Sequence, residues 1–270
     1  MAVVDLAPPP PARRWTGQRI AGHLLLAFWA GCALAVITYF IVGYDAAFFS
    51  RYGPRILGGL GTTLILVLIS IIIGGLLAIP LTAARLTSNR IIGALAFGYV
   101  YFFRGTPLLA QVFLIYYGAG QFREGLEAVG LWGFFREAFN CAIFAFSLNT
   151  AAYQAEIYRG AIRNIPKGQW EGGRALGISE AVIFRKVILP QAMVIALRPL
   201  GNEVVLMVKG SAIASVITVF DLMGETRLAF SRSFDFQVYL WAALLYLLIV
   251  ETLRRIWDAF EVRLTRHLVR

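Results

Sequence analysis

Six long apolar segments, separated by polar and basic stretches, dominate the pattern of this sequence. Each approaches the roughly 20 apolar residues that a helix needs to cross the hydrocarbon of a bilayer. We therefore expect an all-α membrane protein with six transmembrane helices, arranged as one N-terminal span and a core of five. The expected spans cover residues 24–42, 57–82, 91–118 (interrupted), 139–157, 200–220 and 238–250.

The composition supports a chain surrounded by membrane lipid. Hydrophobic residues make up 59% of the 270 residues, and charged residues only 15%. Soluble domains have about 45–50% and 25%, so a soluble enzyme would have to expose much apolar surface to water. Both cysteines, Cys32 and Cys141, lie in apolar runs and are expected to be small buried hydrophobes rather than a disulfide. The first segment is longer than the apolar run of a signal peptide, so we expect it to be retained.

The distribution of basic residues predicts the orientation. Of the 25 lysines and arginines, 17 fall in the two tails and in the loops after the second and fourth spans, against six in the other loops. The positive-inside rule then places both termini and the long loop 158–199 in the cytoplasm. The Pro- and Arg-containing tail 1–23 and the basic tail 258–270 are cytoplasmic in this topology. The net charge of +10 is thus explained without nucleic acid.

Motifs that bind nucleotides or metals, or that carry out hydrolysis, are missing. The sequence has no G-x-x-x-x-G-K-[ST] loop, no G-x-S-x-G and no H-E-x-x-H. Its two histidines, His23 and His267, flank the apolar segments, which argues against a metal site built on histidine. We therefore expect no catalytic residue and no bound cofactor. Uphill transport would need either an ion gradient or a partner that hydrolyses ATP.

The cytoplasmic loop 158–199 predicts two short helices with a glycine between them. A first helix is expected over Gln169–Leu176, ended by Gly177 in a conformation with positive φ. Ser179 is placed to cap the second helix. Pro190 is expected to end that helix or to kink its continuation. Such a compact pair can dock on a partner, whereas the simpler alternative is an amphipathic loop lying on the bilayer.

The same loop carries a family resemblance. The residues Glu171-Gly-Gly-x-x-x-Gly177, followed by Ile188-x-Pro190, resemble the EAA loop of permeases in ATP-binding-cassette (ABC) importers. The family usually has alanines at the positions of Gly172 and Gly173. Three further stretches resemble the subfamily that takes up polar amino acids such as histidine, glutamine, arginine and opines. They read Arg104-Gly-Thr-Pro-Leu-Leu-Ala-Gln111, Ser147-Leu-Asn-Thr-Ala-Ala-Tyr-Gln-Ala-Glu-Ile-Tyr-Arg-Gly160 and Pro199-Leu-Gly-Asn-Glu203.

This resemblance covers roughly residues 58–255 and implies a permease core over 57–257, preceded by an extra transmembrane helix over 24–44. It implies a subunit of the bacterial inner membrane that works with an ABC ATPase dimer, a second identical or paralogous permease and an extracytoplasmic binding protein. ATP and Mg would be used by the ATPase alone. The cytoplasmic coupling helices would dock on the ATPase through Gly168, Glu171, Gly172, Gly173, Arg174, Gly177, Ile188 and Pro190.

Polar residues inside apolar segments are costly and thus mark a translocation path. Asn149, Tyr153 and Glu156 share one helix face, where Glu156 is expected to take a substrate ammonium group or, alternatively, to pair with Arg159 or Arg163. Arg104, beside the break in the third span, suits a carboxylate or else serves as an internal counter-ion. Glu203 is expected to support packing. The predicted path residues are Arg104, Thr106, Gln111, Asn149, Thr150, Tyr153, Glu156, Lys209 and Ser211.

A different class of function stays open at this point. An ion-coupled secondary transporter could use Glu156, Arg104 and Lys209 as relays and would need no ATPase. Inverted internal repeats would favour it, and we find none that is convincing.

Overall fold

The computed structural model describes residues 16–266, which form helices joined by short turns and contain no strand. The chain divides after Phe49 into two compact units, and each is described by itself. Residues 1–15 of the expected N-terminal tail and 267–270 of the expected C-terminal tail lie outside the described residues.

The N-terminal unit consists mainly of helix α1 (Gly17–Val42), which Thr16 caps by accepting a hydrogen bond from the backbone N–H of Arg19. This cap makes the helix begin before Leu24, the start that the hydrophobic pattern predicts. None of its residues is buried, and apolar side chains surround it on all sides. A helix that is apolar all round suits lipid rather than water.

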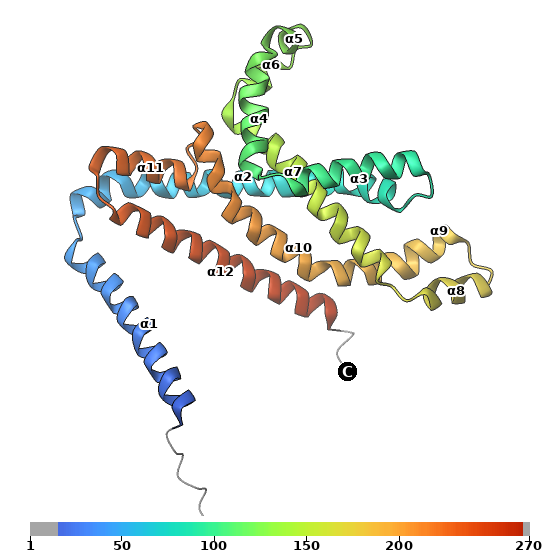
Figure 1. Ribbon diagram of the computed structural model, residues 1–270, viewed down its shortest axis with the longest axis horizontal. Helices are drawn as coiled ribbons and strands as arrows, with labels where there is room; N and C mark the ends of the chain where they lie inside the picture. The colour runs from blue at the N-terminus through green and yellow to red at the C-terminus, as the bar shows by residue number, and fades with distance from the viewer. Residues whose placement is uncertain (1–15, 267–270) are drawn as a thin grey trace, which may run out of the picture. The chain divides into compact units, whose positions relative to one another are not determined.

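The larger unit contains the rest of the helices (Figure 1). Helix α2 (Ala46–Leu86) leads into it, and α7 (Ala138–Arg163) lies at its centre. The others are α3 (Arg90–Gly105), α4 (Leu108–Gln121), α5 (Arg123–Ala128), α6 (Trp132–Phe135), α8 (Lys167–Ala175), α9 (Glu180–Ile183), the π-helical turn η1 (Phe184–Ile188), α10 (Leu189–Ser211), the 3-10 helix η2 (Ala212–Ile217), α11 (Leu222–Ser233) and α12 (Gln237–Thr265).

Within residues 16–266, three helices are long and apolar enough to cross a membrane: α1, α2 and α12. The number rises to five if each of two bent helix pairs counts as one span. The expected fourth span, 139–157, is helical but is not among them, because α7 carries polar side chains turned into the bundle. The all-α membrane fold is confirmed, and the count of six spans stays a prediction.

Helix α7 is the central element because small residues let its neighbours approach closely. Ala151, Ala152 and Ala155 are fully buried, and α7 contacts α3, α4 and α10. It also meets α2, where a Cβ at Gly74 would collide with the side-chain methyl of Thr150. Polar side chains add to this contact, since the Gln154 amide donates to the Ile71 carbonyl at 3.1 Å.

The expected interruption of the third span is confirmed as a sharp bend of 104° between α3 and α4. Thr106 takes an extended conformation, with φ −111° and ψ 148°, and Pro107 is the N-cap residue before α4. A residue before proline is kept out of the helical region by the proline ring, so the sequence itself causes this break. In Figure 1, α4 rises from the bundle and carries α5 and α6 at its far end.

The predicted turn in the loop 158–199 is also confirmed. Gly177 has φ +71°, its N–H donates to the Arg174 carbonyl, and the N–H of Ile178 donates to the Gly173 carbonyl. These two bonds form a Schellman motif, which ends α8. The second helix starts after Ser179, as expected, but the Ser179 side chain makes no capping hydrogen bond.

Of the two expectations for Pro190, an end of the second helix is wrong, and a kink in its continuation stays a prediction. The helix continues from Glu180 through the π-helical turn η1 into α10 and reaches Ser211. Pro190 lies in the first turn of α10, directly after the wider π-helical turn η1. The part of the loop 158–199 that begins at Glu180 and the fifth expected span therefore belong to one continuous helical segment.

Candidate functional site

A buried polar network surrounds the break between α3 and α4. The Gln111 amide nitrogen lies 2.9 Å from the Phe103 carbonyl, 3.1 Å from the Thr106 carbonyl and 2.8 Å from the Thr106 hydroxyl. Asn149 donates to the Gln111 side-chain oxygen at 2.9 Å and to the Phe103 carbonyl at 3.0 Å. Carbonyls freed by a helix break inside a membrane must find such donors. Thr106, Gln111 and Asn149, which the sequence assigns to the path, together stabilise the broken span.

We expect Gln111→Leu to destabilise the protein, because Leu cannot supply the amide that serves the freed carbonyls. Leaving buried polar groups without partners costs about 1–3 kcal/mol. A thermal unfolding experiment in detergent should therefore show a lower midpoint than for the parent. The matched control is Gln121→Leu at the exposed end of the same helix. Equal midpoints for the two variants would contradict this role of Gln111.

A second polar contact joins α7 to α10. The Thr150 hydroxyl donates to the Glu203 carboxylate at 2.8 Å, and both side chains are buried. This geometry assigns Thr150 and Glu203 to packing between helices. Near the end of α10, Lys209 is exposed, whereas the Ser211 side chain is completely buried and donates a hydrogen bond to the Val208 carbonyl.

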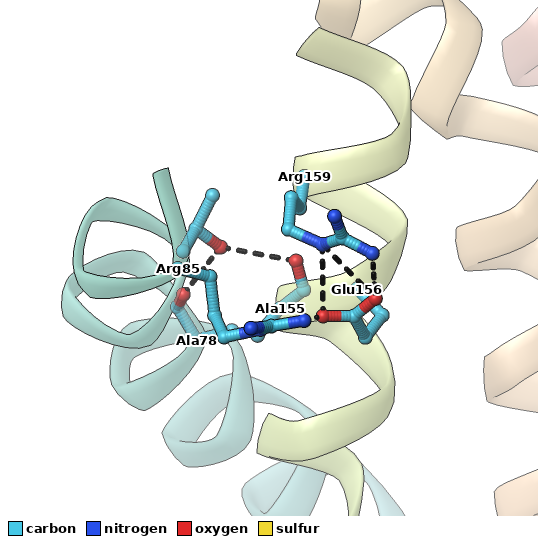
Figure 2. Close-up of polar contacts among 6 residues, drawn as sticks. Ala78, Arg85, Ala155, Glu156 and Arg159 are labelled. Carbon is cyan, nitrogen blue, oxygen red and sulfur yellow. Dashed lines mark hydrogen bonds and ion pairs between the residues drawn. The ribbon is translucent and has the colours of Figure 1, made fainter. Parts of the chain in front are cut away.

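Glu156 lies between two arginines at the ends of α2 and α7 (Figure 2). Arg85 Nε donates to its Oε1 at 3.1 Å, and Arg159 Nη2 donates to its Oε2 at 2.5 Å. All three side chains are at least three-quarters shielded from solvent. Arg159 is one of the partners that the sequence suggests. Arg85 is not, because 71 residues separate it from Glu156 and its charge looks like a topology signal alone.

A cavity of about 320 Å³ opens beside this cluster. Arg104 reaches it from the end of α3, with its guanidinium 5.2 Å from the centre of the Tyr153 ring. Arg104 and Glu156 therefore line the same cavity, and Tyr153 lies under the Arg104 guanidinium, while Lys209 and Ser211 do not line this cavity. The lining residues are Arg85, Phe97, Val100, Tyr101, Arg104, Gly105, Glu156 and Arg159.

The coupling helices form a second candidate site. Trp170 stacks on Phe184, and Gly173 is buried directly against Ile183. Fully buried Ile188 continues this apolar cluster towards α7 and α10. The helices α8 and α9 are thus packed together with η1 and against the end of α7.

On the outer side of the coupling helices, charged and small residues face solvent. Arg174 Nε donates a hydrogen bond to the Glu180 carboxylate at 2.6 Å across the turn, and this bond raises the pKa of Arg174 above its usual value. Gly168, Glu171 and Gly172 are exposed beside this pair. Exposed ion pairs contribute little stability, so this surface is available for a partner without loss to the fold.

Comparison with known proteins decides the family. Residues 70–266 match the family described as binding-protein-dependent transport system inner membrane component. The chain belongs to this family. As a member, this permease is a transport subunit of the inner membrane. Within residues 16–266, no group of three or more His, Cys, Asp or Glu side chains is placed to hold a metal ion.

Individual relatives agree with this assignment. The permease is 44% identical over 216 residues to the nopaline transport system permease protein of Agrobacterium fabrum, covering 80% of this chain and 90% of that one. It is 40% identical over 199 residues to the arginine ABC transporter permease protein of Escherichia coli strain K12, covering 74% and 89%. A solved structure described as an amino acid ABC transporter with histidines superimposes with a TM-score of 0.73 at 35% identity, covering 82% and 99%.

These similarities confirm that the chain is a permease subunit of an ABC importer with the all-α fold of that class. They give no support to the ion-coupled secondary transporter. The extra helix α1 lies before the matched residues 70–266.

Proposed function

We propose that this permease takes up polar amino acids or related compounds, such as opines, by alternating access, driven by ATP hydrolysis in a separate ABC ATPase dimer. The observation that carries this proposal is the coupling-helix pair, closed by Gly177 and continuous with α10. The names of the nopaline and arginine permeases support the substrate class.

The coupling surface consists of the exposed side of α8 and the turn after it. Glu171 is the polar contact for the ATPase, flanked by Gly168 and Gly172, which leave room for close approach. Movement of the docked ATPase reaches the membrane core through η1 and Pro190, since the helix continues without a break into α10. Such coupling requires the ATPase to hold this segment differently in its two states.

The translocation path runs along the Arg104, Tyr153 and Glu156 side of α7. Thr106, Gln111, Asn149 and Thr150 hold the broken span and the neighbouring helices in position beside this path. Lys209 and Ser211 contribute from α10, where exposed Lys209 faces the space that a second permease subunit closes.

The partners follow from the importer class. We propose an ABC ATPase dimer that uses ATP and Mg, a second permease that is identical or paralogous, and an extracytoplasmic substrate-binding protein. Both termini and the coupling helices face the cytoplasm, in agreement with the excess of basic residues on that side. Six spans cross the inner membrane in this arrangement, with α7 shielded from lipid by its neighbours.

A co-purification experiment tests the proposed docking surface. We expect the parent chain, extracted from its native membrane in mild detergent, to bring down a stoichiometric ABC ATPase. Glu171→Lys should reduce the recovered ATPase at least about tenfold, because one lost charged contact in a docking surface is worth more than about 1.4 kcal/mol.

Glu124→Lys is the matched control, since Glu124 is an exposed glutamate in α5, outside the coupling helices. Equal recovery of the ATPase with both variants would contradict docking at Glu171. A chain that purifies alone and transports amino acids in liposomes under an ion gradient would contradict the proposal as a whole.

A further inference from the structure

The carboxylate of Glu156 is already occupied by arginines. Its Oε1 accepts hydrogen bonds from Arg85 Nε at 3.1 Å and from Arg159 Nε at 3.0 Å, and its Oε2 accepts from Arg159 Nη2 and Nε. A carboxylate has about four lone-pair positions, so little capacity is left for an ammonium group. Glu156 therefore acts as an internal anion between two cations.

The cavity beside this cluster has an excess of positive charge. Three of its lining side chains are arginines, and Glu156 is its one acidic lining residue. Arg85 and Arg159 share that single carboxylate. Among the described residues Arg104 forms no direct ion pair. Its guanidinium lies over the ring of Tyr153, and the buried Glu203 carboxylate on α10, outside the lining of this cavity, is the acidic group that interacts with it electrostatically. Charge of this kind in a partly shielded cavity attracts anions and repels free cations.

The positive charges are separated into two groups. Arg104 lies alone at the end of α3. The second group is Arg85 and Arg159, which share the Glu156 carboxylate; Arg85 lies at the end of α2 and contacts the ring of Phe97, near the middle of α3. Between them, the exposed aromatic side chains of Phe97 and Tyr101 provide an apolar wall. This layout fits a carbon chain that carries an anionic group at each end.

We propose that this cavity binds a substrate with two carboxylates, one held by Arg104 and the other by Arg85 and Arg159 in place of Glu156. The inference rests on the proposed import of amino acids and related compounds, and it narrows that class to dicarboxylates. Arginine is suited to this task because its planar guanidinium donates two parallel hydrogen bonds to a carboxylate. Glu156 occupies the second position when no substrate is present and returns to it when the substrate leaves.

The test uses the purified importer complex in nanodiscs without its binding protein, so that the permease alone selects the ligand. The probes are glutarate and its monoamide glutaramate, which differ in one charge at nearly equal size. Calorimetric titration should show glutarate binding at least about tenfold more tightly, as expected for one additional charged contact. Raising the salt concentration should weaken glutarate binding more than glutaramate binding.

Three variants separate the proposal from its alternatives. Arg104→Gln should remove the preference for glutarate, and Arg123→Gln, an exposed control in α5, should keep it. Glu156→Gln should raise the affinity for glutarate several-fold, because the competing internal carboxylate is gone. A purely structural ion pair would give no such gain, and an ammonium site would instead lose affinity for arginine in this variant.

Equal binding of glutarate and glutaramate, or the absence of binding by both, would overturn the inference. The same would follow if arginine bound more tightly than glutarate and lost its affinity in Glu156→Gln. Parallel assays of ATP hydrolysis and uptake, with the binding protein present, distinguish a failure of the dicarboxylate site from a failure of the proposed function. A complex that couples hydrolysis to uptake but does not prefer glutarate contradicts only the dicarboxylate site. A complex without coupled uptake contradicts the proposed function as well.

Discussion

Replacing Gly177 by proline is expected to uncouple ATP hydrolysis from transport while leaving membrane insertion intact. Gly177 has φ +71°, whereas the proline ring fixes φ near −65°, and proline also lacks the N–H that donates to the Arg174 carbonyl. An incompatible substitution of this kind destabilises the local structure by more than about 1 kcal/mol. We expect uptake to fall by more than about fivefold, since each 1.4 kcal/mol changes an equilibrium tenfold.

The measurement is the number of substrate molecules transported per ATP hydrolysed in proteoliposomes that contain the whole importer. Gly177→Asn is the matched control, because asparagine tolerates positive φ better than other residues with a side chain. It should keep most of the uptake. Normal transport by Gly177→Pro would show that the Schellman turn has no part in coupling.

The second large effect is expected at Gly173, one of two adjacent glycines where the family usually has alanine. A Cβ at Gly173 would lie 2.7 Å from two side-chain carbons of Ile183, which is fully buried. The larger side chain in Gly173→Val therefore forces α8 away from α9. Overpacking of this kind costs about 1–3 kcal/mol, which should lower both ATPase recovery and uptake by about five- to a hundredfold.

The neighbouring glycine supplies the control, since a Cβ at Gly172 meets nothing within 4 Å. Gly172→Ala should preserve uptake and raise the stability of α8 by about 1 kcal/mol through its better helix propensity. Combining Gly173→Val with Ile183→Ala should recover much of the lost uptake, because the second change removes the colliding atoms. If Gly172→Ala and Gly173→Val behaved alike, contact with Ile183 could not be the cause.

Local sequence signals predict those structural features that are determined by one or two residues. Thr106-Pro107 predicts the break between α3 and α4, and Gly177 predicts the end of α8, because each depends on the conformational preference of one or two residues. The same reasoning fails at Pro190 where it predicts a helix end. A proline in a helix usually ends or bends it, but here η1 precedes it and the helix continues. That outcome depends on the burial of Ile183 and Ile188 against α7 and α10, which a local pattern does not contain.

The candidate site likewise combines features that the local sequence predicts with features that depend on contacts between distant segments. Helical periodicity brings Asn149, Tyr153 and Glu156 to one face of α7, and the structure agrees that Tyr153 and Glu156 lie near Arg104. The pairing of Glu156 with Arg85 could not be found by periodicity, since it joins two helices far apart in the sequence. Arg85 lies in the last turn of α2, and Glu156 and Arg159 lie near the end of α7, on the expected cytoplasmic side. This shared position near helix ends is the signal that would have indicated the pairing.

The π-helical turn η1 makes the length of the coupling segment as important as its composition. Ile183 and Ile188 are five residues apart, yet both are fully buried, a register that the wider turn permits. Deleting one residue there would restore ordinary α-helical winding and rotate α8 and α9 about 100° around the axis of α10. The ATPase-facing surface would then point away from its partner although every side chain in it was unchanged. In this segment, the number of residues is therefore constrained as well as the identity of the buried residues and of the glycines in the turn.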